Sequence, residues 1–148
     1  MNVCLNHLKV LAIVCLTVLS NTDLFPQDKR AVDSLINIVG NGLHDTAEVN
    51  ALDELSSLYE NGDLKKGIFY AKESFALAEK SGFKKGMLLA LNQEGNILNS
   101  CGQYDQAILN YEKVIEKAKL WNFPNLIARA YANTGNAYRF KGNYSKAI

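Results

Sequence analysis

The chain has 148 residues, of which 48% are apolar and 21% are charged, and its formal net charge at pH 7 is +1. This length and composition indicate one folded, soluble domain rather than a disordered or fibrous chain. A nearly neutral charge gives no basic surface for phosphates, which argues against nucleic-acid binding. The two histidines and three cysteines have no metal-ligand spacing, so we expect no metal site.

The chain begins with the pattern of a secretory signal peptide. Lys9 precedes an almost unbroken apolar run over residues 10–19. This run is shorter than the roughly 20 residues that a membrane span needs. We therefore expect residues 1–20 to be an export signal, ending as late as residue 27 in one alternative. An uncleaved segment that tethers the chain to a membrane is the other alternative. After removal of residues 1–20, Cys101 is the one remaining cysteine, so packing rather than a disulfide must stabilise the domain.

Residues 28–46 are expected to form a short helix and a linker. Apolar residues recur at helical spacing from Ala31 to Val39, and Gly40-Asn41-Gly42 ends this helix. Asp45 and Glu48 have the spacing of a capping box, which indicates that the next helix begins there. We expect the short helix to cover the apolar side of the units that follow, as the ends of repeat arrays require.

From residue 47 onward the sequence repeats with a period of 40 residues. Gly62, Gly102 and Gly142 are equally spaced, and Gly95-Asn96 corresponds to Gly135-Asn136. Self-similarity at a fixed period is typical of repeat architectures. We expect two complete units and one incomplete unit, over residues 47–86, 87–126 and 127–148.

Each unit has the pattern of two antiparallel helices. Residues 104–121 carry one apolar stripe, whereas residues 85–101 carry two apolar faces and a third, polar face. Two apolar faces indicate a helical neighbour on each side. A mid-helix glycine costs about 0.5–1 kcal/mol relative to alanine, so we expect Gly95 to allow a close helix contact opposite Ala107. The predicted helices are 30–39, 47–60, 64–81, 85–101, 104–121 and 125–141.

This pattern resembles the tetratricopeptide repeat (TPR). A small residue in the first helix, an aromatic one turn later and Gly-x-aromatic-x-x-Ala across the turn are matched by Gly135, Tyr138, Gly142, Tyr144 and Ala147. The middle unit has Leu98 in place of the aromatic, and the first unit has Gly67 where alanine is expected. The resemblance covers about residues 45–148. It implies an all-α fold, an α-solenoid of about two and a half helix pairs with a short N-terminal capping helix. It also implies a scaffold that binds a protein or an extended peptide.

The overall layout is also similar to the exported N-terminal region of bacterial sensor proteins. In those proteins TPR arrays precede a membrane span and a histidine kinase or DNA-binding output domain, which implies a periplasmic or membrane-associated location. Because the third unit is unfinished at Ile148, we expect the chain to be a fragment. The alternative function is therefore the sensory region of a truncated signal-transduction protein.

The polar face of the first helices is the candidate ligand-binding surface. Its side chains, on two successive units, are Asn92, Asn96, Asn99, Arg129, Asn136 and Arg139. Amide and guanidinium groups can hydrogen-bond the backbone or a carboxylate of an extended peptide. A solvated surface without a ligand is the alternative. If the amides instead tie the repeats together, the loops around Trp121 and Phe123 become the second candidate.

Other polar residues give weaker signals. One TPR subgroup clamps a peptide carboxylate in its first repeat, but Asp53 in the corresponding region would repel a carboxylate. We expect Glu94 to be a rim carboxylate paired with a lysine. His44 is the one histidine beyond residue 20 and has no positioned nucleophile or acid partner. With no phosphate-binding glycine loop or serine elbow either, we expect no enzymatic activity and no cofactor.

Overall fold

The computed structural model describes residues 26–42 and 45–142, and in these residues every regular element is an α-helix. The all-α prediction is therefore confirmed for the described part of the chain. The predicted export segment, His44 and the Tyr144–Ala147 motif lie outside the described residues. The helices, in chain order, are α2 (Pro26–Gly40), α3 (Thr46–Leu58), α4 (Leu64–Ser81), α5 (Lys84–Ser100), α6 (Tyr104–Leu120) and α7 (Pro124–Phe140).

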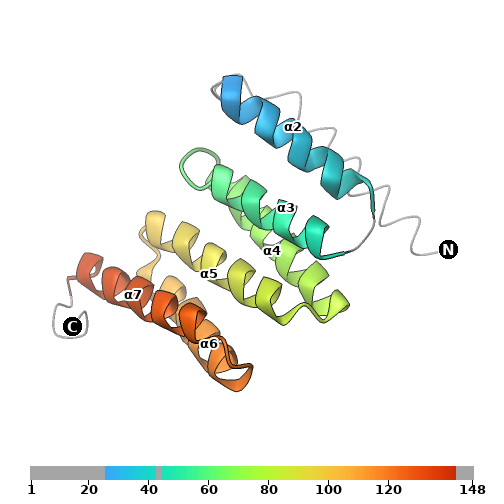
Figure 1. The fold of residues 1–148 in the computed structure, drawn as a ribbon. Coiled ribbons are helices and arrows are strands. Elements are labelled where there is room, and N and C mark those ends of the chain that lie inside the picture. Colours follow the sequence, from blue (N-terminus) through green and yellow to red (C-terminus); the bar gives the residue numbers. More distant parts are fainter. Residues whose placement is uncertain (1–25, 43–44, 143–148) are drawn as a thin grey trace.

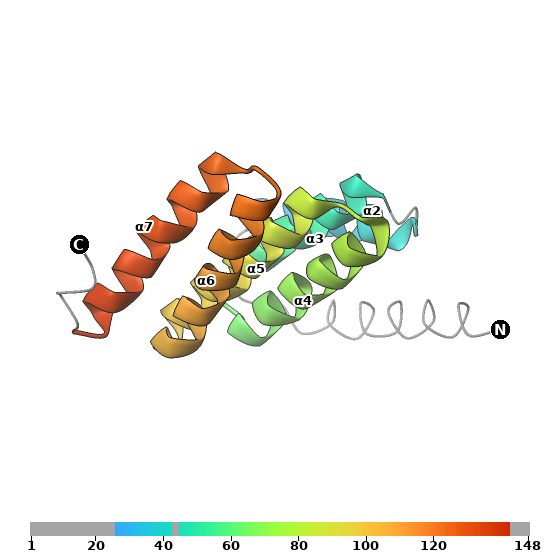
Figure 2. The same cartoon turned by 90° about the horizontal axis from the view of Figure 1, so that it is seen from below.

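The helices form a row that follows the order of the chain (Figure 1). Each helix packs on the next one, and α5 also contacts both α3 and α7. When the molecule is seen from below, α4 and α6 lie on one side of the row and α3, α5 and α7 lie on the other (Figure 2). We refer to the surface shared by these three helices as the α3–α5–α7 face.

The helix boundaries follow from local chemistry. Asp45 caps α3, because its carboxylate accepts hydrogen bonds from the backbone N–H groups of Ala47 and Glu48 at 2.9 and 3.0 Å. Gly102 follows the end of α5 with a φ of 75°, in the left-handed region that favours glycine. Pro124 occupies the first turn of α7, where its missing N–H leaves no hydrogen bond unmade.

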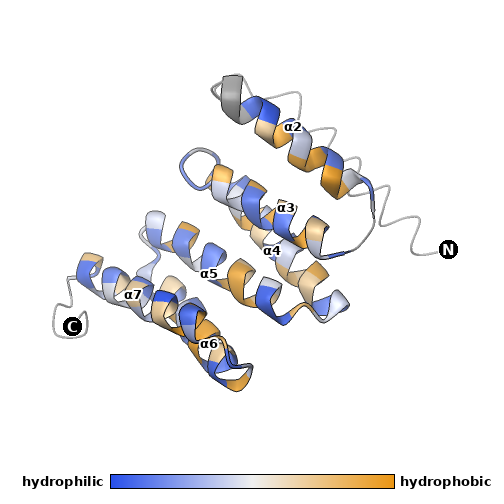
Figure 3. Ribbon diagram, viewed as in Figure 1, coloured by the Kyte–Doolittle hydropathy of each residue, from blue (hydrophilic) through white to orange (hydrophobic). Residues whose placement is uncertain are grey.

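Hydrophobic and hydrophilic residues alternate along each helix (Figure 3), and most of the apolar side chains are buried between neighbouring helices. The predicted covering helix, α2, buries Val32, Leu35 and Val39 against the apolar side of α3 and α4. A second cluster joins α5, α6 and α7, with Tyr111 and Val114 of α6 among its most buried members. Burial of these side chains supplies the main driving force for packing the row.

Gly95 allows the expected close contact, but with a different partner. A Cβ atom at this position would lie 2.6 Å from Cε1 of Tyr111, and its three nearest heavy atoms all belong to that ring. The expected neighbour, Ala107, is fully buried in the same cluster. Tyr111 is one turn further along α6, and its ring reaches back to fill the space that a side chain at position 95 would need.

Gly67, found where alanine was expected, is also explained by a close contact. A Cβ atom there would lie 2.9 Å from Cδ1 of Ile97 and 3.3 Å from the backbone oxygen of Ser56. The buried Ser56 hydroxyl donates a 2.8 Å hydrogen bond to the backbone oxygen of Gly67. A second buried hydroxyl, that of Ser74, donates to the backbone oxygen of Val49 at 3.2 Å. Serine hydroxyls and backbone carbonyls thus join α3 to α4.

Candidate ligand-binding pocket

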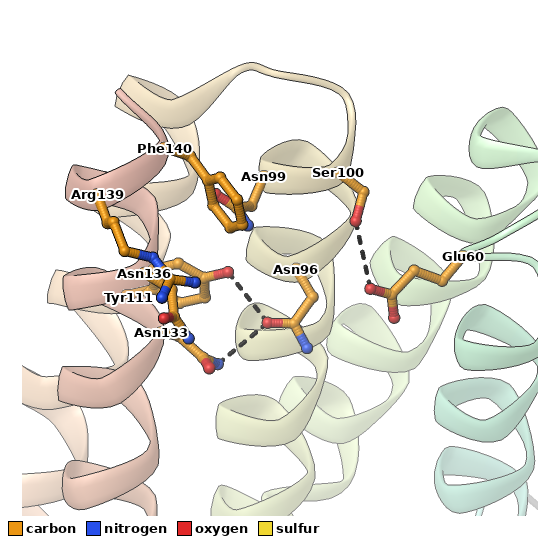
Figure 4. A pocket seen from close by; sticks show the side chains of 9 residues that line it. All are labelled: Glu60, Asn96, Asn99, Ser100, Tyr111, Asn133, Asn136, Arg139 and Phe140. Atoms are coloured by element: carbon orange, nitrogen blue, oxygen red, sulfur yellow. Dashed lines mark hydrogen bonds between the residues drawn. The ribbon is translucent and has the colours of Figure 1, made fainter. Parts of the chain in front are cut away.

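A polar pocket of about 260 Å³ opens where α5 and α7 end. Side chains of both helices line it, together with Glu60 from the turn after α3 and Tyr111 from α6 (Figure 4). The lining residues are Glu60, Asn96, Asn99, Ser100, Tyr111, Asn133, Asn136, Arg139 and Phe140.

A hydrogen-bonded network centred on Asn96 forms one wall of this pocket. The Asn96 side-chain oxygen accepts from the Tyr111 hydroxyl and from the Asn133 amide, each at 3.0 Å (Figure 4). The same Asn133 nitrogen also donates to the Asn92 side-chain oxygen at 3.1 Å. The network therefore ties α5 to both α6 and α7 through side chains.

The network continues toward α3. The Asn96 side-chain nitrogen donates to Gln93 Oε1 at 3.2 Å, and Gln93 Nε2 donates to Glu60 Oε2 at 2.9 Å. The Ser100 hydroxyl lies 3.5 Å from the other carboxylate oxygen of Glu60. Because a carboxylate can only accept hydrogen bonds, Glu60 fixes the direction in which the two amides point.

Tyr111 contributes both to the core and to the pocket. The residue is only 1% exposed, and burial raises the pKa of its hydroxyl, with the nearby charge of Glu60 adding to the effect. The hydroxyl therefore stays protonated at physiological pH and acts as the donor to Asn96. It is not a candidate general base.

Three pocket residues carry polar groups that the fold leaves unused. Asn99 Oδ1 is buried and has no hydrogen-bond partner among the described residues. Asn136 and Arg139 are exposed, and neither side chain makes a hydrogen bond or ion pair with another described residue. The Arg139 guanidinium lies 5.1 Å from the centre of the Phe140 ring. The pocket thus has unpaired acceptors on Asn99 and Asn136 and unpaired donors on Asn136 and Arg139.

The structure brings four of the six predicted site residues, Asn96, Asn99, Asn136 and Arg139, into this pocket. The other two lie elsewhere. Asn92 is only 4% exposed and bonds to Asn133, so it does not belong to a solvated face. Arg129 is exposed on α7 and does not line the pocket.

Arg129 acts electrostatically on Asp53 of α3. Burial raises the pKa of Asp53 to about 6, the positive charge of Arg129 opposes this shift, and the neighbouring Glu54 adds to it. Asp53 Oδ1 is buried without a hydrogen-bond partner among the described residues. Asp53, on the α3 side of the face, is therefore a carboxyl group whose desolvation is only partly offset by the positive charge of Arg129.

Sequence reasoning missed several lining residues. Asn133 lies 40 residues after Gln93, so the repeat period itself offered this pair of amides. Glu60 follows the end of a helix in a turn, where no periodic pattern indicates its direction. Tyr111 was assigned to the core, and its ring is there, but periodicity does not show where a hydroxyl points.

The weaker sequence signals have clear positions. Glu94 forms an ion pair with Lys72 at 3.8 Å, as expected for a rim carboxylate. Trp121, in the second candidate surface, is half-buried, and the ammonium groups of Lys84 and Lys117 lie 5.7 and 5.4 Å from its ring centre.

No protein-family model matches the chain, and no curated protein matches it significantly. Within residues 26–42 and 45–142, no helix is both long and apolar enough to cross a membrane. The same residues contain no cluster of three or more histidine, cysteine or acidic side chains that could hold a metal ion.

Proposed function

We propose that this protein is a non-enzymatic, TPR-like scaffold that binds a protein segment or an extended peptide on its α3–α5–α7 face. The 40-residue sequence period and the ordered packing of the helices support an α-solenoid of helix pairs. The observation that carries the binding proposal is the buried, unpartnered Asn99 Oδ1 beside the unpaired Asn136 and Arg139. An unsatisfied buried acceptor costs about 1–3 kcal/mol, which a ligand donor would relieve.

The chemistry of the pocket suits a peptide backbone. Peptide groups present one donor and one acceptor per residue, and asparagine amides supply both complements. Phe140 and the ring side of Tyr111 add apolar surface to a pocket that is otherwise polar.

The proposal is tested with peptides selected from a display library on the full chain. Binding of the labelled peptides is then followed by fluorescence anisotropy. Asn136→Ala should weaken binding about 2- to 10-fold, because it removes one hydrogen-bonding amide. Asn125→Ala makes the same change on the exposed first turn of α7 and should have no effect. Peptides that bind equally well to wild type, Asn136→Ala and Arg139→Ala would place the ligand elsewhere and contradict the proposal.

A second candidate function is the sensory region of a membrane-bound kinase or transcriptional regulator. The export pattern in residues 1–20 supports it, because such regions act outside the cytoplasm. The reading frame beyond codon 148 separates the two candidates. A membrane span followed by a kinase core establishes the sensory region, and a stop after one or two further helices establishes a free-standing scaffold.

A further inference from the structure

Opposite charges are segregated on the two outer helices of the α3–α5–α7 face. Helix α3 carries the half-buried Asp53 and the exposed Glu54 and no lysine or arginine, while its third acid, Glu48, is buried. Helix α7 carries Arg129 and Arg139 and no acid. Because the whole chain is nearly neutral, this segregation is a local property of the face.

The pocket repeats this arrangement at short range. Glu60 enters from the α3 side and Arg139 from α7, with Asn96 and Asn99 of α5 between them (Figure 4). Neither charged group forms an ion pair with a described residue. Further along the face, the acid Asp53 again belongs to α3 and the base Arg129 to α7. The positive charge of Arg129 lowers the pKa of Asp53, although the two groups form no ion pair.

We infer that the ligand is a bipolar extended segment, with basic groups on the α3 side and acidic groups on the α7 side. This inference rests on the function proposed above and specifies the chemistry of its ligand. A carboxylate beside Asp53 and Glu60, or an ammonium group beside Arg129 and Arg139, would be repelled. Complementary charge across an interface fixes the register of a ligand and suppresses wrong partners.

Three eight-residue peptides with four lysines and four glutamates each test the inference. In an extended strand, successive side chains point to opposite sides. Alternating Lys-Glu therefore places the two charges on opposite sides, and four lysines followed by four glutamates place them at opposite ends. A repeated Lys-Lys-Glu-Glu pattern mixes both charges on both sides. The three peptides have the same composition and net charge, so only the arrangement of the charges differs.

Binding to the full chain is measured by anisotropy at low ionic strength. We expect one of the two segregated peptides to bind at least about tenfold more tightly than the mixed peptide, because it can form several ion pairs at once. The preference should decrease as salt is added, since these groups lie at the surface. The better segregated peptide also shows whether the segment runs along or across the helices.

Charge-removing variants connect this preference to the pocket. Glu60→Gln and Arg139→Gln should each reduce the preference to less than about threefold. Glu112→Gln and Lys113→Gln remove the same charges from the exposed surface of α6 and should leave it unchanged. Glu60 also holds Gln93 and Ser100, so if Glu60→Gln unfolds the chain, Arg139→Gln alone decides the result.

The outcomes separate this inference from the proposed function. Three peptides that bind within about threefold of each other would overturn the bipolar ligand and leave a peptide-binding face in place. A segregated preference that survives Arg139→Gln would also overturn it. If neither these peptides nor any selected from a library bind the α3–α5–α7 face, the proposed function fails and this inference fails with it.

Discussion

The contact between α3 and α4 and the contact between α5 and α6 both depend on a glycine, but different groups complete them. At the first contact, Gly67 lies beside Ser56, and two buried serine hydroxyls donate to backbone oxygens. At the second contact, Gly95 lies against the Tyr111 ring, and the Tyr111 hydroxyl continues into the amide network. The first contact is closed within the core, and the second opens onto the pocket.

This difference indicates where binding and packing can influence each other. A backbone carbonyl inside a helix has a fixed position, so hydroxyls that bond to it serve the fold alone. Side-chain amides can change partners by rotation. A ligand that bonds to Asn96 therefore acts on the side chain that joins α5 to α6 and α7. The serine hydroxyls between α3 and α4 do not line the described pocket.

The largest expected effect is that of Tyr111→Ala. Loss of the buried ring beside Gly95 should lower the free energy of unfolding by about 3–5 kcal/mol. Tyr111→Phe keeps the ring and removes one hydrogen bond, so it should cost only about 0.5–1.5 kcal/mol. Urea denaturation monitored by circular dichroism measures both. Equal losses in the two variants would show that the hydroxyl, rather than the ring, maintains this contact.

Gly95→Ala and Gly67→Ala compare the two contacts directly. The new Cβ at position 95 would meet an aromatic ring at 2.6 Å, whereas at position 67 the closest atom is the flexible end of Ile97 at 2.9 Å. Overpacking costs about 1–3 kcal/mol, which outweighs the helix-propensity gain of alanine. We expect a loss of about 1–2 kcal/mol for Gly95→Ala and a smaller loss for Gly67→Ala. The reverse order in thermal denaturation would contradict the tighter fit assigned to Gly95.

Asp53→Asn tests the acidic side of the face. The folded-state pKa of Asp53, about 6, lies above its ordinary value of 3.8. The folded state therefore binds a proton more tightly than the unfolded chain, and this stabilisation is present below about pH 4 and lost as the pH rises through 6. Above that pH, Asp53→Asn should be more stable than wild type by about 1–2 kcal/mol, allowing for the partial exposure of the group.

Wild type and Asp53→Asn should have the same stability near pH 4, where Asp53 is largely protonated in wild type. Thermal unfolding at several pH values between 4 and 8 makes the comparison, with Glu112→Gln on the exposed surface of α6 as the control. Parallel pH profiles for wild type and Asp53→Asn would show that burial does not perturb this carboxyl group.

The smallest effects separate the two kinds of asparagine in the pocket. Asn96→Ala removes a side chain with three hydrogen-bond partners and should destabilise the fold by about 0.5–1.5 kcal/mol or slightly more. Asn136→Ala removes an exposed amide without partners and should change stability by less than about 0.5 kcal/mol. If both variants are equally stable in calorimetry, the network contributes nothing to the α5–α7 contact.

Periodicity predicted most of the fold because each long helix buries one or two continuous stripes. The prediction for residues 64–81 agrees with α4 at both ends, and those for α5, α6 and α7 agree within one residue. The first turn of α2, from Pro26, was missed because the apolar stripe begins only at Ala31. The assignment to the TPR family and the function stay predictions.

The candidate site was predictable only as a face. The spacing of Asn96, Asn99, Asn136 and Arg139 placed them on one side of their helices, and the structure gathers them at one pocket. Which of them are already bonded depends on distances between helices, and a single sequence does not contain these. Asn92 illustrates the limit. Its spacing predicted an exposed position, whereas the structure buries it and bonds it to Asn133.

The position of Trp121 has a practical consequence for spectroscopy. This tryptophan, the only one in the chain, lies with Lys84 and Lys117 where α5 and α7 begin, and the pocket lies where these helices end, about 25 Å away along a 17-residue helix. Its emission therefore reports on the turn between α6 and α7, and it is a poor indicator of an occupant in the pocket. Tyr111 absorbs at the pocket itself, so difference absorbance near the tyrosine band is the intrinsic optical signal that follows occupancy.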